Sequence, residues 1–167
     1  MSKVKIFILF FVSLFLDMTI LPKFTIYGIS PTIAIAVIVV ISMFAKSDKI
    51  TYYGIFLGLV FDIVFGKIVG LRALSFYLIS YYTFKNRKFE GATFSYGLIA
   101  AFISVLLNEI YLYVANIIRL GSINVGQFVN YFIQYISLSL AINIVIYIVV
   151  YFIIDRIRKT ENKKFFY

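Results

Sequence analysis

The 167-residue sequence contains no cysteine, no histidine and no tryptophan, and only two prolines. Without histidine it lacks the side chain that most often acts as a general base near neutral pH. Without cysteine it has neither a thiol nucleophile nor a disulfide, and the two absences together remove the commonest ligands of transition metals. The chain also shows no phosphate-binding loop and no metal-ligand cluster. These absences predict a protein that is not an enzyme and holds no cofactor.

Charged residues are scarce as well, at 14%, whereas hydrophobic residues make up 63% and the mean hydropathy is +1.01. Soluble domains are only about 45–50% apolar, so this composition is typical of an integral membrane protein. The net charge of +9 comes from short basic clusters that lie between apolar runs. That pattern is typical of membrane topology and does not indicate nucleic-acid binding.

The apolar runs predict one membrane domain of six helical spans. The spans are expected at about residues 4–21, 31–45, 50–66, 71–84, 91–118 and 128–154. The first run is read as a retained span, because no small-residue cleavage site follows it. A basic tail, residues 155–167, follows the last span and is expected to contact anionic lipid.

The sixteen basic residues support this division of the chain. Six spans place both termini on one side, and twelve of the sixteen basic residues then fall on that side. Only Lys23, Lys67, Arg72 and Arg119 fall on the other. The positive-inside rule therefore predicts that both termini are cytoplasmic.

Residues 53–72 carry a small or acidic residue at every fourth position: Gly54, Gly58, Asp62, Gly66 and Gly70. Positions four apart lie on nearly the same face of a helix. Gly54 and Gly58 thus predict a notch that admits a neighbouring helix, and Asp62 is expected to fix its register by one hydrogen bond. The neighbour is either another span of this chain or a span of a partner, so these five residues are candidates for a partner interface.

The other polar groups within the predicted spans are also candidates for a function. They are Asp17, Asn108, Glu109, Gln134 and Asn143. A buried acid in a membrane needs a partner, so each is expected to face protein. One interpretation is that the acids Asp17, Asp62 and Glu109 form a proton or cation relay or a polar substrate site. The other is structural hydrogen bonding, in which Asn108, Glu109, Gln134 and Asn143 connect the fifth and sixth spans.

The sequence around the repeated glycines resembles the family of the rod shape-determining protein MreD. Pro31 opens the second span, the glycine-rich third span has a single aspartate, and the fourth span ends with Tyr81 and Tyr82. The detailed resemblance covers residues 31–82. The family often has Asp or Asn after the proline, where this chain has Thr32.

The resemblance implies a multi-pass protein of the bacterial cell membrane that supports cell elongation as a non-enzymatic scaffold. It implies association with MreC and, with it, the glycosyltransferase and transpeptidase that build the lateral wall. The actin-like MreB filament would be an indirect partner on the cytoplasmic side.

The family's fold is also similar to the substrate-binding components of energy-coupling-factor vitamin transporters, which supplies the alternative function. Those components commonly dock their coupling subunit through small residues of the first span. Here Ser13 is the only small residue of that span.

Overall fold

The computed structural model describes residues 3–25, 29, 31–65, 69–90, 93–120 and 135–163. Within these ranges the chain forms six α-helices, so the predicted all-α class is confirmed. The helices are α1 (Lys3–Phe15), α2 (Ile33–Phe44), α3 (Ile50–Phe65), α4 (Leu71–Glu90), α5 (Phe94–Leu120) and α7 (Ser137–Lys163).

The first five helices begin within three residues of the predicted span starts, but α4 and α7 end well after the predicted spans. Helix α4 continues past residue 84 to Glu90, and α7 continues past residue 154 to Lys163. The added residues are rich in Lys, Arg and Glu, which favour helix even where they no longer favour a membrane. The predicted start of the sixth span, residues 128–134, lies outside the described residues.

Three helical segments in the described ranges are long and apolar enough to cross a membrane: Val4–Lys23, Phe94–Ala115 and Ser137–Thr160. The apolar helices Ile33–Phe44 and Ile50–Val64 are shorter. Helix α2 has 12 residues, which corresponds to about 18 Å of rise, against about 30 Å of hydrocarbon in a bilayer. Its ends therefore need polar partners supplied by the protein.

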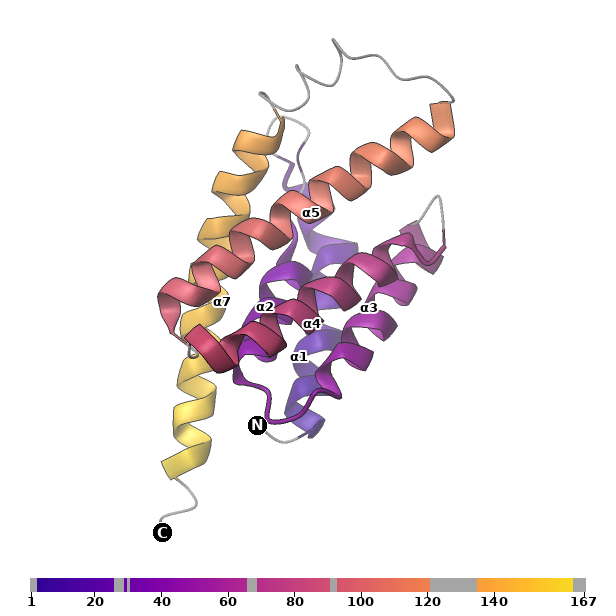
Figure 1. The fold of residues 1–167 in the computed structure, drawn as a ribbon. Helices are drawn as coiled ribbons and strands as arrows, with labels where there is room; N and C mark the ends of the chain where they lie inside the picture. The colour runs from indigo at the N-terminus through magenta and orange to yellow at the C-terminus, as the bar shows by residue number, and fades with distance from the viewer. Residues whose placement is uncertain are drawn as a thin grey trace.

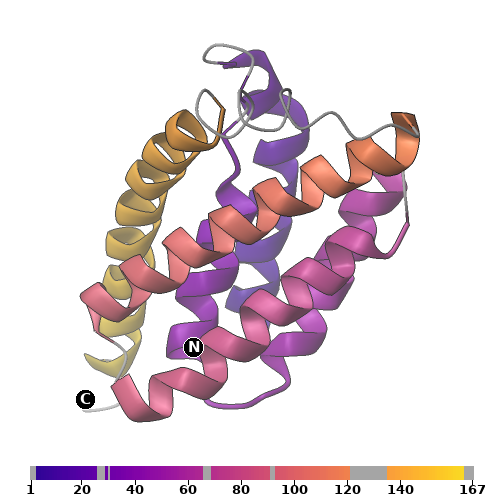
Figure 2. The same ribbon diagram turned by 45° about the horizontal axis from the view of Figure 1, so that its top comes forward.

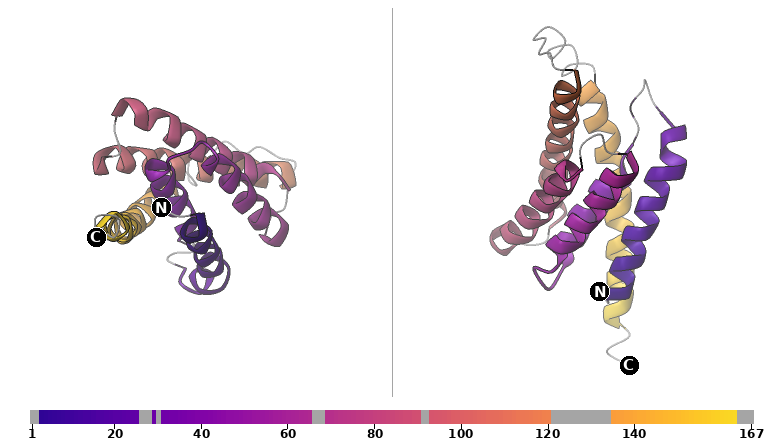
Figure 3. Two further views of the ribbon diagram at one scale, coloured as in Figure 1. Left: turned by 90° about the horizontal axis from the view of Figure 1, so that it is seen from below. Right: turned by 90° about the vertical axis from the view of Figure 1, so that its right-hand side faces the viewer.

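Helix α2 lies at the centre of the molecule, with α1, α4, α5 and α7 packed against it. Every residue from Ala34 to Phe44 is buried. The sequence explains this position, since α2 is apolar on all sides apart from Ser42, and such a helix is stable only when it is surrounded. Figure 3 shows α2 between α1, α7 and the remaining helices when the molecule is seen from below.

Helices α3 and α4 form an antiparallel hairpin, the most extensive helix pair of the fold. Helix α5 has 27 residues, about 40 Å of rise, and crosses the bundle obliquely (Figure 2). It packs against α4, α2 and α7. A helix longer than the hydrocarbon thickness fits a membrane by tilting, and the oblique course of α5 agrees with that.

The first helix changes its winding before it ends. After Phe15 it continues as one turn of π-helix, Leu16–Ile20 (η1), and then as a short 3-10 turn, Leu21–Lys23 (η2), which contains Pro22. Wide turns of this kind often occur at functional positions because they redirect a side chain. Here the turn carries Asp17, which is buried.

Helix α1 begins and helix α7 ends at the same end of the molecule (Figure 1). The side view in Figure 3 shows the same arrangement, with the two helices running alongside each other in opposite directions. An even number of helices that alternate in direction places the start of the first helix and the end of the last at the same end of the molecule.

Candidate functional site

The start of α2 is held by an acidic residue from another helix. Asp17 Oδ1 accepts a hydrogen bond from the Ile33 N–H at 2.7 Å, and Oδ2 accepts one from the Ala34 N–H at 2.8 Å. The first N–H groups of a helix have no partner within it, and a carboxylate there also faces the positive end of the helix dipole. Thr32, at the N-cap position, forms no side-chain cap bond. Asp17 therefore performs the capping role from a distance.

Asn143 of α7 binds the backbone N–H group of Thr32, directly before the two N–H groups that Asp17 binds at the start of α2. Its Oδ1 accepts from the Thr32 N–H at 3.0 Å, while its Nδ2 donates to Ser139 O at 2.9 Å and to Ser139 Oγ at 3.2 Å. The Ser139 hydroxyl in turn donates to Glu109 Oε1 of α5 at 2.6 Å. A continuous chain of hydrogen bonds thus connects the start of α2 through α7 to α5, and all these side chains are buried.

The other end of α2 meets basic residues. Arg87 of α4 donates a hydrogen bond from Nη1 to the Met43 carbonyl oxygen at 2.8 Å. The guanidinium carbon of Arg158, from α7, lies 4.0 Å from the centre of the Phe44 ring. Cations are favourable near a helix C-terminus, where carbonyl groups lack partners. Helix α2 therefore has an acid at its start and two guanidinium groups at its end.

Asp62 holds the start of α4. Its Oδ2 accepts from the N–H groups of Gly70, Arg72 and Ala73 at 2.8, 3.1 and 3.2 Å. The sequence predicted one hydrogen bond to a packed helix; the structure shows three, all to the backbone of the turn that opens α4. Gly70 has a φ of +96°, a conformation that side chains disfavour, so glycine is needed to bring its N–H to the carboxylate.

Arg72 and Tyr111 lie beside Asp62. The Arg72 guanidinium carbon is 5.2 Å from the centre of the Phe61 ring and 5.4 Å from that of Tyr111. Within the described part of the chain, Asp62 Oδ1 and Arg72 Nε are buried without a hydrogen-bond partner. The Arg72 guanidinium group is therefore in cation–π contact with both rings.

The notch predicted from the glycines faces α4 of the same chain. A Cβ on Gly58 would lie 2.7 Å from Ala73 N and 2.9 Å from Arg72 O; one on Gly54 would lie 2.8 Å from Ser80 Oγ and 2.9 Å from Phe76 O. Both glycines therefore allow α3 and α4 to approach closely. Gly66 lies outside the described residues.

The predicted polar residues fall into two places in the fold. Asp17 and Asn143 meet at the start of α2, with Glu109 joined to them through Ser139. Asp62 lies at the start of α4, with different partners. Asn108 is buried on α5 next to Glu109, and Gln134 lies outside the described residues.

Sequence reasoning did not identify three residues of this arrangement: Ser139, Arg87 and Arg158. Ser139 precedes Asn143 by four residues, and that spacing on one helix face was an available signal. Arg87 and Arg158 were interpreted only as topology signals. Their contacts with α2 depend on α4 and α7 extending beyond the apolar runs, which the hydropathy pattern did not show.

Two comparisons gave no match: no curated protein and no solved structure matches this chain. A protein-family model does match. It is described as rod shape-determining protein MreD, and the match covers residues 2–157. This range includes the glycine-rich stretch, Asp17 and Asn143 at the start of α2, Arg87 at its end, and most of α7, but not Arg158. The chain therefore belongs to the MreD family of rod shape-determining proteins.

Proposed function

We propose that this protein is a non-enzymatic membrane scaffold of the cell-elongation machinery. Family membership assigns it a role in rod-shape determination. The finer proposal is that it associates with MreC and thereby with the glycosyltransferase and transpeptidase that build lateral peptidoglycan. MreB would be reached indirectly, from the cytoplasmic side.

The observation that carries the scaffold proposal is the use of the buried carboxylates. Asp17 accepts backbone hydrogen bonds at the start of α2, and Asp62 does the same at the start of α4. A carboxylate that caps a helix stabilises the fold. We therefore assign both acids to the rigidity of the bundle, which is the property that a docking platform requires, and not to proton transfer.

The proposed topology is six spans in the bacterial cytoplasmic membrane with both termini inside. The distribution of basic residues supports it, with twelve on one side and four on the other. The common end shared by the start of α1 and the end of α7 also supports it (Figure 1). Helices α2 and α3 are shorter than the hydrocarbon layer, so their ends would lie below the membrane surface on at least one side.

The five residues from Gly54 to Gly70 acquire a more specific role in this proposal. Since α4 covers Gly54 and Gly58, a partner helix would meet the outer face of the α3–α4 hairpin and not the notch itself. Ile63, on α3, and Leu74, on α4, are 72% and 54% exposed. The glycines and Asp62 would then act by shaping the hairpin that presents this face.

The test is purification of the tagged protein from its native membrane in mild detergent, with mass spectrometry of the co-purifying proteins. We expect MreC and wall synthases. The variant Ile63→Ala/Leu74→Ala should recover less MreC than wild type, whereas Ile99→Ala, at an equally exposed site on α5, should recover as much. Recovery of a coupling subunit with paired ATPases in place of MreC would overturn the scaffold proposal and favour a transporter component.

A further inference from the structure

Helices α1 and α7 border an apolar groove on the outside of the molecule. The groove has a volume of about 600 Å³. Its walls include Leu9, Val12 and Leu16 of α1 and Val145, Val149 and Ile153 of α7. Ile33 and Val37 of α2 form its floor. In Figure 3, the view from below shows α1 and α7 on either side of α2.

Basic residues extend both walls at one end of this groove. Lys5 precedes Leu9 by four residues on α1, and Arg156 follows Val149 by seven on α7, so each continues the groove-lining face of its helix. Helix α1 begins where α7 ends (Figure 3). The two cations therefore flank the same mouth of the groove.

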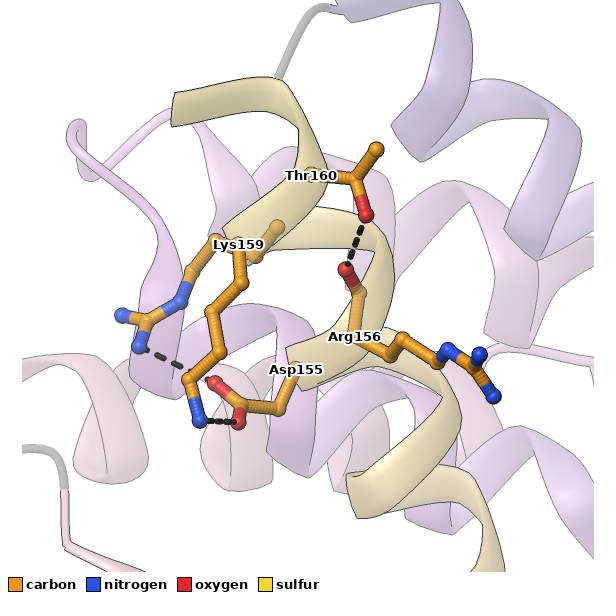
Figure 4. Close-up of polar contacts among 5 residues, drawn as sticks. Asp155, Arg156, Lys159 and Thr160 are labelled. Carbon is orange, nitrogen blue, oxygen red and sulfur yellow. Dashed lines mark hydrogen bonds and ion pairs between the residues drawn. The ribbon is translucent and has the colours of Figure 1, made fainter. Parts of the chain in front are cut away.

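The charges around Arg156 leave it available to an anion. Asp155 forms ion pairs with Arg158 at 3.0 Å and Lys159 at 2.6 Å, while the Arg156 side chain points away from that carboxylate (Figure 4). Arg156 is exposed and forms no ion pair with any side chain that the structure describes. A separate hollow of about 520 Å³ on α7 is lined by Phe152, Asp155, Arg156, Lys159 and Thr160, so two basic side chains and one carboxylate share it.

The dimensions and the lining of the groove favour a lipid chain over a helix. The groove-lining stretch of α7, residues 142–154, rises about 18 Å, close to the roughly 15 Å of one bilayer leaflet. Membrane helices associate through small residues that let backbones approach, whereas these walls are bulky Leu, Val and Ile, with Ser13 as the small exception. A flexible acyl chain fits between such side chains without a matching notch.

We propose that this groove is a binding site for an anionic phospholipid. An acyl chain lies along the apolar walls, and the phosphate group lies at the mouth between Lys5 and Arg156. The assignment is independent of the scaffold proposal, because the groove is lined by α1, α2 and α7, includes no residue of the α3–α4 hairpin, and needs no partner protein.

The test uses purified protein reconstituted into vesicles of equal parts phosphatidylglycerol and phosphatidylcholine with identical acyl chains. After extraction in mild detergent, native mass spectrometry counts the lipids that each protein retains. We expect one retained phosphatidylglycerol, favoured about thirtyfold over phosphatidylcholine, as two basic groups near the lipid surface would give. Lys5→Gln/Arg156→Gln should abolish the preference.

Two further variants make the outcome specific. Lys23→Gln/Lys85→Gln removes the same charge elsewhere and should leave the preference unchanged, whereas Val149→Trp fills the groove and should reduce retention of both lipids. All variants are first shown to elute as wild type in size-exclusion chromatography. Equal retention of the two lipids by wild type, an unchanged preference in Lys5→Gln/Arg156→Gln, or a second protein copy in place of the lipid would each overturn the proposal.

Discussion

Asp17 and Ile33 are joined by a 2.7 Å hydrogen bond that links the end of the first helix to the backbone start of the second, 16 residues along the chain. With the bond to Ala34, both oxygens of this buried carboxylate serve one helix end. The acid that the sequence offered as a relay candidate is thus a cap supplied from outside the helix.

Replacing Asp17 by alanine is expected to destabilise the protein by about 1–3 kcal/mol, because one part-buried and one buried N–H group lose their acceptor. Asp17→Asn keeps one accepting oxygen and should cost less. The measurement is the thermal midpoint of the purified protein in detergent. Asp48→Ala, at an exposed turn position, is the control and should leave the midpoint near that of wild type. An Asp17→Ala protein as stable as the control would contradict the capping role.

Asp62→Asn separates structure from proton transfer at the second cap. Asparagine retains an oxygen that can accept from Gly70, Arg72 and Ala73, but it cannot exchange a proton. We expect normal abundance and restored rod shape when this variant replaces wild type in the native host, while Asp62→Ala should fold poorly. Round cells that contain a normal amount of Asp62→Asn would instead point to a proton relay through Asp62.

Gly58→Ala should weaken the contact between α3 and α4. The new Cβ would meet the backbone of Ala73 and Arg72, which cannot move aside as a side-chain tip can. We expect a loss of about 1–3 kcal/mol, measured by unfolding in detergent. Ile63→Ala, on the exposed face of the same helix, provides the matched comparison and should cost little. Similar losses in the two variants would mean that the close approach at Gly58 contributes nothing particular.

Gly97 and Tyr147 form a second tight contact, suited to a double-mutant cycle. A Cβ on Gly97 would overlap the Tyr147 hydroxyl and would lie close to Met43 Sδ. That hydroxyl makes two long bonds, 3.4 Å to the Phe94 carbonyl oxygen and 4.0 Å to Met43 Sδ, so Tyr147→Phe alone should be nearly neutral. Gly97→Ala alone should lower the thermal midpoint, and adding Tyr147→Phe should recover part of the loss. Strictly additive effects would show that the two side chains do not compete for this space.

Arg87→Gln tests the other end of α2. The change removes the charged donor to the Met43 carbonyl oxygen, and we expect a loss of about 1–2 kcal/mol in unfolding free energy. Lys85→Gln removes the same charge two residues earlier on α4, where the lysine lies over the Tyr81 ring and donates to the Tyr81 hydroxyl. If the two variants have the same unfolding free energy, Arg87 stabilises the protein only through its surface charge and not through its hydrogen bond to the end of α2.

The features that were predictable from sequence depend on residues close together in the chain. Gly54 and Gly58 lie on one helix face whatever the rest of the fold does, so the spacing predicted a close helix contact, and α4 provides it. The apolar stretch at residues 33–44 likewise predicted a helical span, and α2 occupies it. The family resemblance depended on the same local pattern, and the family match confirms it.

The partners of the polar residues were not predictable in the same way. The bond from Thr32 to Asn143 spans 111 positions, and that from Arg87 to Met43 spans 44. Periodicity shows which face of a helix is buried, but it does not show which other helix arrives there. Glu109 does form a hydrogen bond between the fifth and sixth spans, as the sequence led us to expect. That its partner is Ser139, and that Ser139 is bonded in turn to Asn143 at the start of α2, is evident only from the tertiary fold.

The hydrogen bond from the Thr32 N–H to Asn143 has a consequence for how the protein folds in the membrane. Helix α2 is synthesised early, but one of the acceptors for its first N–H groups belongs to the last helix. During synthesis the second helix therefore remains incompletely bonded until α7 has entered the bilayer and docked. A product truncated before Asn143 exposes that open helix end, which makes completion of the chain a condition for a closed bundle.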